Sequence, residues 1–247
     1  MENLKAVVLA AGKGKRMHSE NSDLPKVMRE ALGRPLLSYV LDALPVESPS
    51  DAVVVVGYKR EKVIEAYPEC TFAVQAEQKG TGHAVASARE ALEGFRGDVL
   101  VCCGDTPLIT RQTLEGLCEA HRASGSDCTV LAGASNHPMP GLGRVKRTAE
   151  GGFVAIVEEK DCTPEEREIR EYNSGIYVFN AEKLFSALKL VKTDNAQGEY
   201  YLTDVPYIMR ERGDRVSVSV QDMGPELIGV NRPEELAEVE RILEERI

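Results

Sequence analysis

Short apolar runs alternate with segments of helical periodicity through the first half of this chain, and this alternation limits the fold more than any other feature of the sequence. The runs are rich in Val, Leu, Ala and Cys and lie at residues 5–10, 52–56, 70–74, 99–103 and 128–133. Helices are expected between them at residues 34–44, 60–66, 83–92 and 110–122. Apolar strands separated by helices are typical of parallel sheets covered on both faces. The sequence therefore predicts a Rossmann-like, doubly wound α/β fold.

The pattern changes after residue 133, where strand-like runs follow one another with little helix between them. These runs lie at residues 143–148, 153–158 and 175–179. Helices are then expected at residues 181–190 and 201–212, a strand at 216–220 and a last helix from Pro233, whose fixed φ suits the first helical position. We therefore predict an antiparallel section added to a mostly parallel mixed sheet, in one domain over residues 1–247.

Composition and charge argue against several other classes of protein. The hydrophobic fraction is 43%, enough for a sizeable core, and the formal net charge is −10. Duplex-binding proteins usually carry a basic surface, so no nucleic-acid partner is expected. No run approaches the roughly 18 apolar residues of a membrane span, and no secretory signal or membrane association is expected. The six cysteines lack metal-binding spacing and are typical of reduced thiols, which predicts a cytoplasmic location.

A glycine-rich loop with three cations follows the first predicted strand. Gly12 and Gly14 allow backbone N–H groups to approach phosphate oxygens closely. Lys13, Lys15 and Arg16 add positive charge in the same turn. In open α/β sheets, ligands bind beyond the carboxyl ends of the strands, which is where this loop is expected. The loop is a candidate phosphate site, and the alternative is an ordinary turn with solvated cations.

The loop matches neither of two well-known phosphate-binding motifs. Met17 stands where the dinucleotide fingerprint needs its third glycine, and this counts against an NAD-dependent oxidoreductase. The Gly-Lys-Ser/Thr ending of the P-loop is absent as well. Lys26, a short way on, adds a further cation. The sequence thus favours a phosphate cradle of another kind.

Residues 9–17 (LAAGKGKRM) and 24–27 (LPKV) resemble the signature of the nucleotide-sugar pyrophosphorylase family, and most of all its N-acetylglucosamine-1-phosphate uridyltransferases. Further matches follow in the family's order at residues 75–84, 104–108, 143–144, 157–160, 173–175, 195–204 and 229–231. The resemblance implies Mg²⁺-dependent transfer of a uridylyl group from UTP to N-acetylglucosamine-1-phosphate, which gives UDP-N-acetylglucosamine and pyrophosphate. Residues 1–125 would mainly bind the nucleotide, and residues 126–247 mainly the sugar.

The resemblance also implies roles for individual residues. Nucleotide contacts are implied for Ala11, Gly12, Gly14, Gln75 and Gly80. Phosphate contacts and catalysis are implied for Arg16, Lys26 and Asp105. Sugar contacts are implied for Thr81, Gly143, Glu158 and Asn173. The implied Mg²⁺ ligands are Asp105 and Asn231.

This sequence departs from the family's pattern at several places. Residues 18–23 are longer than the usual loop before the Leu-Pro-Lys segment. Cys103 stands where this subfamily often has Tyr beside the sugar, and Ser174 replaces a usual Thr. The family's acetyltransferase half, a left-handed β-helix, is not expected within residues 1–247.

The residue types agree with this chemistry, although each has a simpler alternative. Mg²⁺ prefers hard oxygen ligands, which suits Asp105, but an Asp after a strand is often a helix cap or a turn residue. The amide of Gln75 can both donate and accept, as a uracil edge requires. His83 is expected to have a structural role, because the attacking phosphate is already anionic. Glu158 and Glu159 are not expected to act as a glycosidase pair, because neighbours on a strand point to opposite faces.

Two other functions stay open from the sequence alone. Another sugar-1-phosphate nucleotidyltransferase, acting on glucose-1-phosphate or with a different base, would share the same motifs. A non-catalytic nucleotide-sugar-binding protein would bind the ligand without Mg²⁺-dependent turnover.

Overall fold

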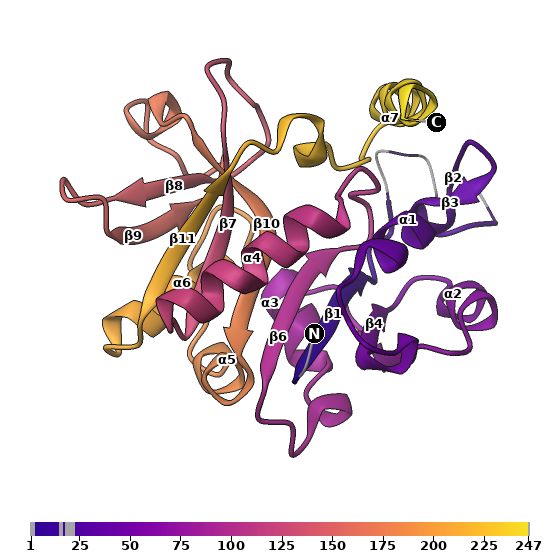
Figure 1. Cartoon of the computed structure of the whole chain (residues 1–247), viewed down its shortest axis with the longest axis horizontal. Helices are drawn as coiled ribbons and strands as arrows, with labels where there is room; N and C mark the ends of the chain where they lie inside the picture. The colour runs from indigo at the N-terminus through magenta and orange to yellow at the C-terminus, as the bar shows by residue number, and fades with distance from the viewer. Residues whose placement is uncertain (1–2, 15–16, 18–22, 247) are drawn as a thin grey trace.

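The computed structural model describes residues 3–14, 17 and 23–246, which build one nine-stranded sheet and a two-stranded ribbon (Figure 1). The strands are β1 (Leu4–Ala10), β2 (Glu30–Ala31), β3 (Arg34–Pro35), β4 (Ala52–Val56), β5 (Thr71–Val74), β6 (Asp98–Cys103), β7 (Cys128–Ala134), β8 (Arg144–Arg147), β9 (Phe153–Val157), β10 (Glu171–Asn180) and β11 (Val216–Gln221). The order in the large sheet is β11-β7-β10-β6-β1-β4-β5, and β8 and β9 extend it beside β10. The ribbon pairs β2 with β3.

Most neighbouring strands in the main path of the sheet run parallel. β1 lies parallel between β4 and β6, β5 is parallel to β4, and β11 is parallel to β7. β10 runs antiparallel between β6 and β7, and the β8–β9 hairpin is antiparallel too. The predicted mostly parallel mixed sheet with an antiparallel section is therefore confirmed.

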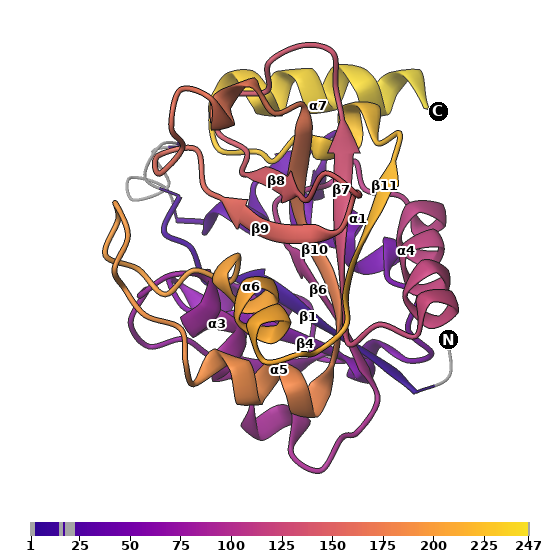
Figure 2. The same cartoon turned by 90° about the vertical axis from the view of Figure 1, so that its left-hand side faces the viewer.

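Helices cover both faces of the sheet. They are α1 (Leu36–Ala43), α2 (Arg60–Ala66), α3 (Thr81–Ser87), α4 (Arg111–Ser124), α5 (Ala181–Leu188), α6 (Asp204–Glu211) and α7 (Pro233–Glu245). Short 3₁₀ segments are η3 (Lys26–Met28), η4 (Pro49–Asp51), η5 (Glu90–Leu92), η6 (Glu166–Glu168) and η7 (Gly224–Leu227). Figure 2 shows α3, α5 and α6 grouped on one face, α4 on the other, and α7 across the top of the molecule.

The core explains why the strands appear as apolar runs in the sequence. All five residues of β4 are buried, because helices cover the sheet on both sides. Side chains alternate along β1, so Val7 packs with α3, α5 and α6 while Val8 packs with α1, α2 and α4. A third cluster joins Val239 of α7 to Leu36 and Leu108. The C-terminal helix is thereby fixed beside the loop that follows β6.

Some predicted element boundaries are wrong. The helix expected at residues 83–92 ends at Ser87 and is followed by the separate 3₁₀ turn η5. The helix expected at residues 34–44 begins at Leu36, because the two residues before it pair in the ribbon. The strand expected at residues 175–179 begins at Glu171, and its pairing with β7 shifts register between Asn173 and Tyr177. These differences depend on pairing between distant segments, which periodicity does not report.

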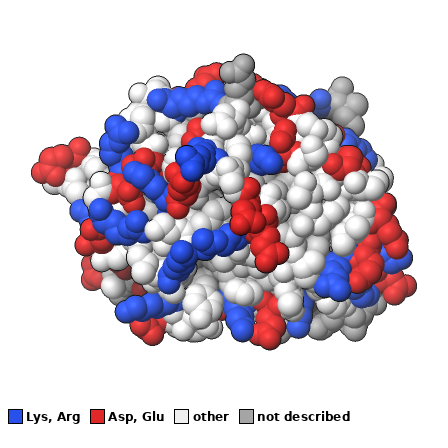
Figure 3. Space-filling view, turned by 90° about the horizontal axis from the view of Figure 1, so that it is seen from below, with Lys and Arg blue, Asp and Glu red and all other residues white. Residues whose placement is uncertain are grey.

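Other general features of the described residues bear on the sequence predictions. None of the helices in residues 3–14, 17 and 23–246 has the length and apolar character needed to cross a bilayer. All six cysteines are free, and four of them are buried. On the face seen in Figure 3, acidic and basic side chains lie side by side, and neither sign forms a continuous patch there.

Candidate active site

The parallel strands bring three of the sequence motifs, and Gly57 with them, to one edge of the sheet. The glycine loop follows β1, Gly57 follows β4, Gln75 follows β5 and Asp105 follows β6. These loops lie close together, because a Cβ added to Gly57 would come within 2.9 Å of the carbonyl oxygen of Ala11. The carboxyl ends of parallel strands are the usual ligand site in such sheets. The loops that the sequence singled out therefore lie together at the edge where ligands usually bind.

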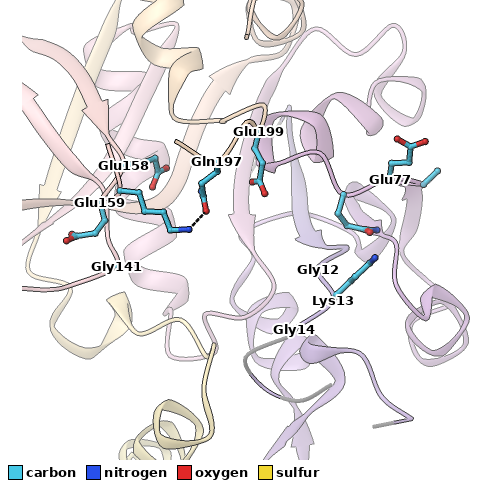
Figure 4. Close-up of a pocket in the computed structure, with 12 residues that line it drawn as sticks. Gly12, Lys13, Gly14, Glu77, Gly141, Glu158, Glu159, Gln197 and Glu199 are labelled. Atoms are coloured by element: carbon cyan, nitrogen blue, oxygen red, sulfur yellow. Dashed lines mark hydrogen bonds between the residues drawn. The ribbon is translucent and has the colours of Figure 1, made fainter. Parts of the chain in front are cut away.

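A cleft of about 1010 Å³ opens at this edge. Its lining residues are Gly12, Lys13, Gly14, Ala76, Glu77, Gln78, Gly141, Glu158, Glu159, Lys160, Gln197 and Glu199. Figure 4 shows the glycine loop on one side, Glu158 and Glu159 on the other, and Gln197 and Glu199 between them. Lys13 and Lys160 supply positive charge to the cleft, and four glutamates supply negative charge: Glu77, Glu158, Glu159 and Glu199. The cleft is thus lined by charges of both signs.

Three of the predicted site residues meet at the carboxyl edge of the sheet, although they are far apart in the sequence. The ammonium of Lys26 donates to Asp105 Oδ2, and it also donates to Asn231 Oδ1 at 3.1 Å. The Lys26 and Asp105 side chains are only 14% and 16% exposed. The amide of Val230 donates to the carbonyl oxygen of Asp105 at 2.8 Å, so the two loops are also joined by their backbones.

The oxygens of Asp105 and Asn231 fit a divalent cation. Both already point at a single cation, the Lys26 ammonium. One carboxylate, one amide oxygen and the phosphates of a substrate form the ligand set that Mg²⁺ usually takes in proteins. Within residues 3–14, 17 and 23–246, no cluster of three or more His, Cys, Asp or Glu could hold a metal without such help.

Gln75 is held in a defined orientation next to the glycine loop. Its side chain is 3% exposed, and its Nε2 donates to the carbonyl oxygen of Gly80 at 3.1 Å. The same nitrogen lies 3.1 Å from Nδ1 of His83. His83 thus contacts Gln75, which agrees with the structural role expected for it. A buried, oriented amide of this kind is suited to pair with a base edge.

Replacing Gly80 should weaken both the fold and the position of Gln75. Gly80 has φ +111° and ψ 173°, a region that is essentially restricted to glycine. A Cβ there would lie 2.5 Å from the carbonyl oxygen of Tyr200. We expect Gly80→Ala to lower the free energy of unfolding by about 2–4 kcal/mol in urea titrations, from backbone strain plus overpacking.

Gly94 provides the matched control for this substitution. It also has positive φ, at +77°, but an added Cβ would meet nothing within 4 Å. Gly94→Ala should therefore cost only about 1–2 kcal/mol, the cost of the backbone conformation alone. Equal unfolding free energies for the two variants would show that the contact with Tyr200 has no energetic importance.

Of the residues implied in sugar binding, Glu158 lines the cleft, whereas Thr81, Gly143 and Asn173 do not. Glu158 lies just past β9 and accepts a hydrogen bond from Thr203 Oγ1 at 3.0 Å. Burial raises the pKa of the Glu158 carboxyl above its ordinary value. Asn173 is buried, and its side-chain Nδ2 donates to the Tyr177 hydroxyl at 2.8 Å. Its backbone N–H donates to the carbonyl oxygen of Gly143 at 2.9 Å. Glu158, Asn173 and Gly143 are thus brought to one region.

Cys103 is the last residue of β6 and is close enough to Asp105, Lys26 and Glu158 to be affected by their charges. Burial raises the pKa of its thiol to about 12, and the charge of Asp105 adds to this increase. Lys26 and Glu158 also act on the thiol, in opposite directions. A Cβ on Gly175 would lie 3.9 Å from the Cys103 sulfur, so the thiol faces the turn after Asn173. The neutral thiol therefore provides an apolar contact rather than a nucleophile.

Not every predicted residue can be placed, and some cleft residues had no predicted role. Arg16 lies outside the described residues. Thr81 accepts a hydrogen bond from the amide of Leu202 at 3.0 Å and does not line the cleft. Gln197 and Glu199 do line it, although no role is predicted for them from the sequence. Their motif at residues 195–204 was the available signal, but nothing in it indicated which side chains would face the cleft.

A cleft at the carboxyl edge of a mostly parallel α/β sheet is typical of nucleotide-binding proteins. The chain belongs to the MobA-like NTP transferase family, whose domain matches residues 6–189. The resemblance to nucleotide-sugar pyrophosphorylases, and the prediction of a nucleotidyltransferase, are therefore confirmed.

Individual relatives are similar over the whole chain. This chain is 46% identical over 250 residues to the bifunctional protein GlmU of Geobacter metallireducens, and the match covers 100% of this chain and 52% of that protein. The GlmU of Streptomyces coelicolor is 47% identical over 247 residues, covering 98% of this chain and 50% of that protein. The chain thus spans about half the length of these relatives. A crystal structure of UDP-glucose pyrophosphorylase with UDP-glucose has the same fold, with a TM-score of 0.73 at 18% identity over 98% of this chain and 99% of that chain.

Proposed function

We propose that this chain transfers a uridylyl group from UTP to N-acetylglucosamine-1-phosphate and so forms UDP-N-acetylglucosamine and pyrophosphate. The observation that carries the proposal is the convergence of Lys26, Asp105 and Asn231 at the carboxyl edge of the sheet. The similarity to GlmU proteins supports the choice of substrates. A cytoplasmic location and small-molecule partners go with this proposal.

The nucleotide would occupy the side of the cleft formed by the glycine loop. Backbone groups of Ala11, Gly12 and Gly14 would approach the nucleotide, and Gln75 with Gly80 would hold the uracil. This assignment is supported by the burial of Gln75 and by its hydrogen bond to Gly80, which fixes the direction of the amide. An oriented amide loses little conformational freedom when it pairs with a base.

The triphosphate would lie against Lys26 and Arg16. Asp105 and Asn231 would bind Mg²⁺, which supplies positive charge to the phosphate oxygens when it is bound. Lys26 already contacts both proposed ligands, so its ammonium lies where charge on the phosphates must be neutralised. The protein's part in catalysis is then alignment and electrostatic stabilisation, with no covalent enzyme intermediate.

The reaction requires one bond to form and one to break. A phosphate oxygen of the sugar phosphate attacks the α-phosphorus of UTP, and the bond from that phosphorus to the bridging oxygen breaks. Pyrophosphate leaves with the bonding electrons. The sugar phosphate would lie toward Glu158, Asn173, Gly143 and Thr81. Glu158 accepts hydrogen bonds when ionised, and Asn173 can donate or accept, which suits hydroxyl and acetamido groups.

Replacing Glu158 with Gln should weaken the sugar substrate specifically. The change keeps the shape of the side chain but removes its charge, and hydrogen bonds to charged groups contribute about 1.5–3 kcal/mol. We expect the KM for N-acetylglucosamine-1-phosphate to rise at least about tenfold while the KM for UTP changes little. Glu65→Gln on the exposed side of α2 is the control and should change neither constant. A selective rise in the KM for UTP would contradict the sugar assignment of Glu158.

A substrate panel tests the proposed function itself. Pyrophosphate release is measured with UTP, dTTP, CTP, ATP and GTP, each with N-acetylglucosamine-1-phosphate, glucose-1-phosphate or N-acetylgalactosamine-1-phosphate. UTP with N-acetylglucosamine-1-phosphate should give the highest kcat/KM, and the rate should depend on Mg²⁺. A preference for glucose-1-phosphate would reject the amino sugar but retain a nucleotidyltransferase. Binding without any release would favour a nucleotide-sugar-binding protein.

A further inference from the structure

Thr203 occupies the N-cap position of α6, but its side chain makes no capping hydrogen bond there. A threonine at this position usually accepts from a backbone N–H in the first helical turn. Here Thr203 Oγ1 donates to Glu158 Oε1 at 3.0 Å instead. Thr203 is 4% exposed, so its hydroxyl lies in the interior beside the cleft. The hydroxyl therefore orients another side chain rather than its own helix.

Glu158 needs such a partner, because its surroundings disfavour the ionised carboxylate. Burial raises its pKa, and the negative charges of Asp161, Asp204 and Glu199 raise it further. The hydrogen bond from Thr203 opposes this increase, because it stabilises the charged form. The other titratable groups that act electrostatically with Glu158 are Cys103, Tyr177 and Tyr201.

The residue before Thr203, Leu202, contacts Thr81, a second residue that the proposed function assigns to the sugar. The amide of Leu202 donates to Thr81 Oγ1 at 3.0 Å, and Thr81 begins α3 in the nucleotide half of the chain. The carbonyl oxygen of Tyr200 accepts from the amide of Gly82 at 2.8 Å, which fixes the same segment to α3 a second time. Two consecutive residues, Leu202 and Thr203, thus join two side chains that the proposed function assigns to the sugar.

We propose that Thr203 is a positioning residue for sugar recognition, which holds the Glu158 carboxylate as a hydrogen-bond acceptor at a fixed distance from Thr81. The inference rests on the proposed function, because it assumes that Glu158 contacts the sugar. Thr203 itself acts through Glu158, so its removal should affect the sugar phosphate and leave the nucleotide side unchanged.

Two substitutions separate the hydroxyl from the volume of the side chain. Thr203→Val keeps the shape and removes the donor, and Thr203→Ser keeps the donor. We expect valine to raise the KM for N-acetylglucosamine-1-phosphate about tenfold, the effect of one hydrogen bond to a charged group, with an unchanged KM for UTP. Serine should restore the KM to within about threefold of the unmodified protein, because the donor returns. The serine variant should melt near the normal temperature, and the valine variant should melt lower, because it loses the hydrogen bond to the buried Glu158 carboxylate.

The pH dependence provides a readout that a purely structural role would not change. Ionised Glu158 is the form that accepts from the sugar, so kcat/KM for the sugar phosphate should fall as pH decreases through the pKa of this carboxyl. Loss of the Thr203 donor raises that pKa, because the charged form loses its stabilisation. The acidic limb of the profile should therefore shift to higher pH with valine and return with serine.

The outcomes distinguish this inference from the proposed function. If the unmodified protein releases pyrophosphate as proposed and the valine variant matches it in KM and pH profile, Thr203 does not position Glu158. If Thr203→Val prevents folding, Thr203→Ala replaces it, since alanine also removes the hydroxyl and should change the KM and the pH profile in the same direction. If the unmodified protein shows no turnover at all, the proposed function fails. Calorimetric binding of N-acetylglucosamine-1-phosphate then compares the valine and serine variants directly, and equal affinity overturns the inference.

Discussion

Asp105→Asn is expected to lower kcat by about a thousandfold or more while the protein stays folded. The substitution keeps the shape of the side chain and removes the carboxylate that, with Asn231, is directed at a cation. A bound metal contributes several kcal/mol to stabilising the charge of such a transition state, and each 1.36 kcal/mol is a factor of about ten in rate. Initial rates of pyrophosphate release, with the circular dichroism melting curve beside them, measure the effect.

The control for this variant is an aspartate in an exposed ion pair on another part of the molecule. Asp42 pairs with Arg34 at 2.6 Å, and its side chain is 68% exposed. Asp42→Asn should leave kcat unchanged, because exposed pairs contribute little. Titration of Mn²⁺ in the presence of UTP gives a second readout, in which Asp105→Asn should bind the metal more weakly. Turnover within about threefold of normal would mean that Asp105 is not a ligand in the reacting complex.

Lys26→Met should have the second largest effect, a loss of about 10- to 100-fold in kcat/KM for UTP, which is the range for one charge-assisted contact. Methionine keeps the apolar stem of the side chain, so the change isolates the ammonium. Lys62→Met, on the exposed side of α2, is the matched control and should be neutral. An unchanged kcat/KM for UTP in Lys26→Met would show that the Lys26 ammonium does not act on the phosphates of UTP.

Lys26 and Asp105 can also be replaced together in one double variant. Lys26 and Asp105 contact each other directly, so their effects on turnover should not add. We expect the double variant Lys26→Met, Asp105→Asn to be less impaired than the product of the two single effects. Strict additivity would indicate that the two side chains act on separate steps, despite the contact between them.

The sequence was sufficient to predict that the loops following the parallel strands β1 and β6 lie together at one edge of the sheet. Asp105 follows a continuous apolar run, and such runs form central strands whose carboxyl ends meet at one edge. The glycine loop follows β1 for the same reason, and the two strands pair directly, with Leu9 opposite Cys103. Local patterns therefore predict which loops meet, because the sheet is parallel in this half.

The remaining parts of the site depend on contacts that no local pattern reports. Lys26 contacts Asn231 across 205 residues of sequence, and Thr203 contacts Glu158 across 45. Glu158 was expected inside a strand, yet β9 ends at Val157, so the carboxylate turns toward α6. The register shift in β10 next to Asn173 is likewise set by its pairing with β7. Tertiary packing decides these features, and only the family resemblance pointed to the residues involved.

The most direct test of the account follows the phosphorus atoms of both substrates. Phosphorus NMR of a mixture of UTP, N-acetylglucosamine-1-phosphate, Mg²⁺ and the protein should show the substrate signals replaced by those of UDP-N-acetylglucosamine and pyrophosphate in equal amounts. Omitting the sugar phosphate should leave UTP intact. Hydrolysis of UTP without the sugar phosphate, or no new diphosphate product with both substrates present, would contradict uridylyl transfer.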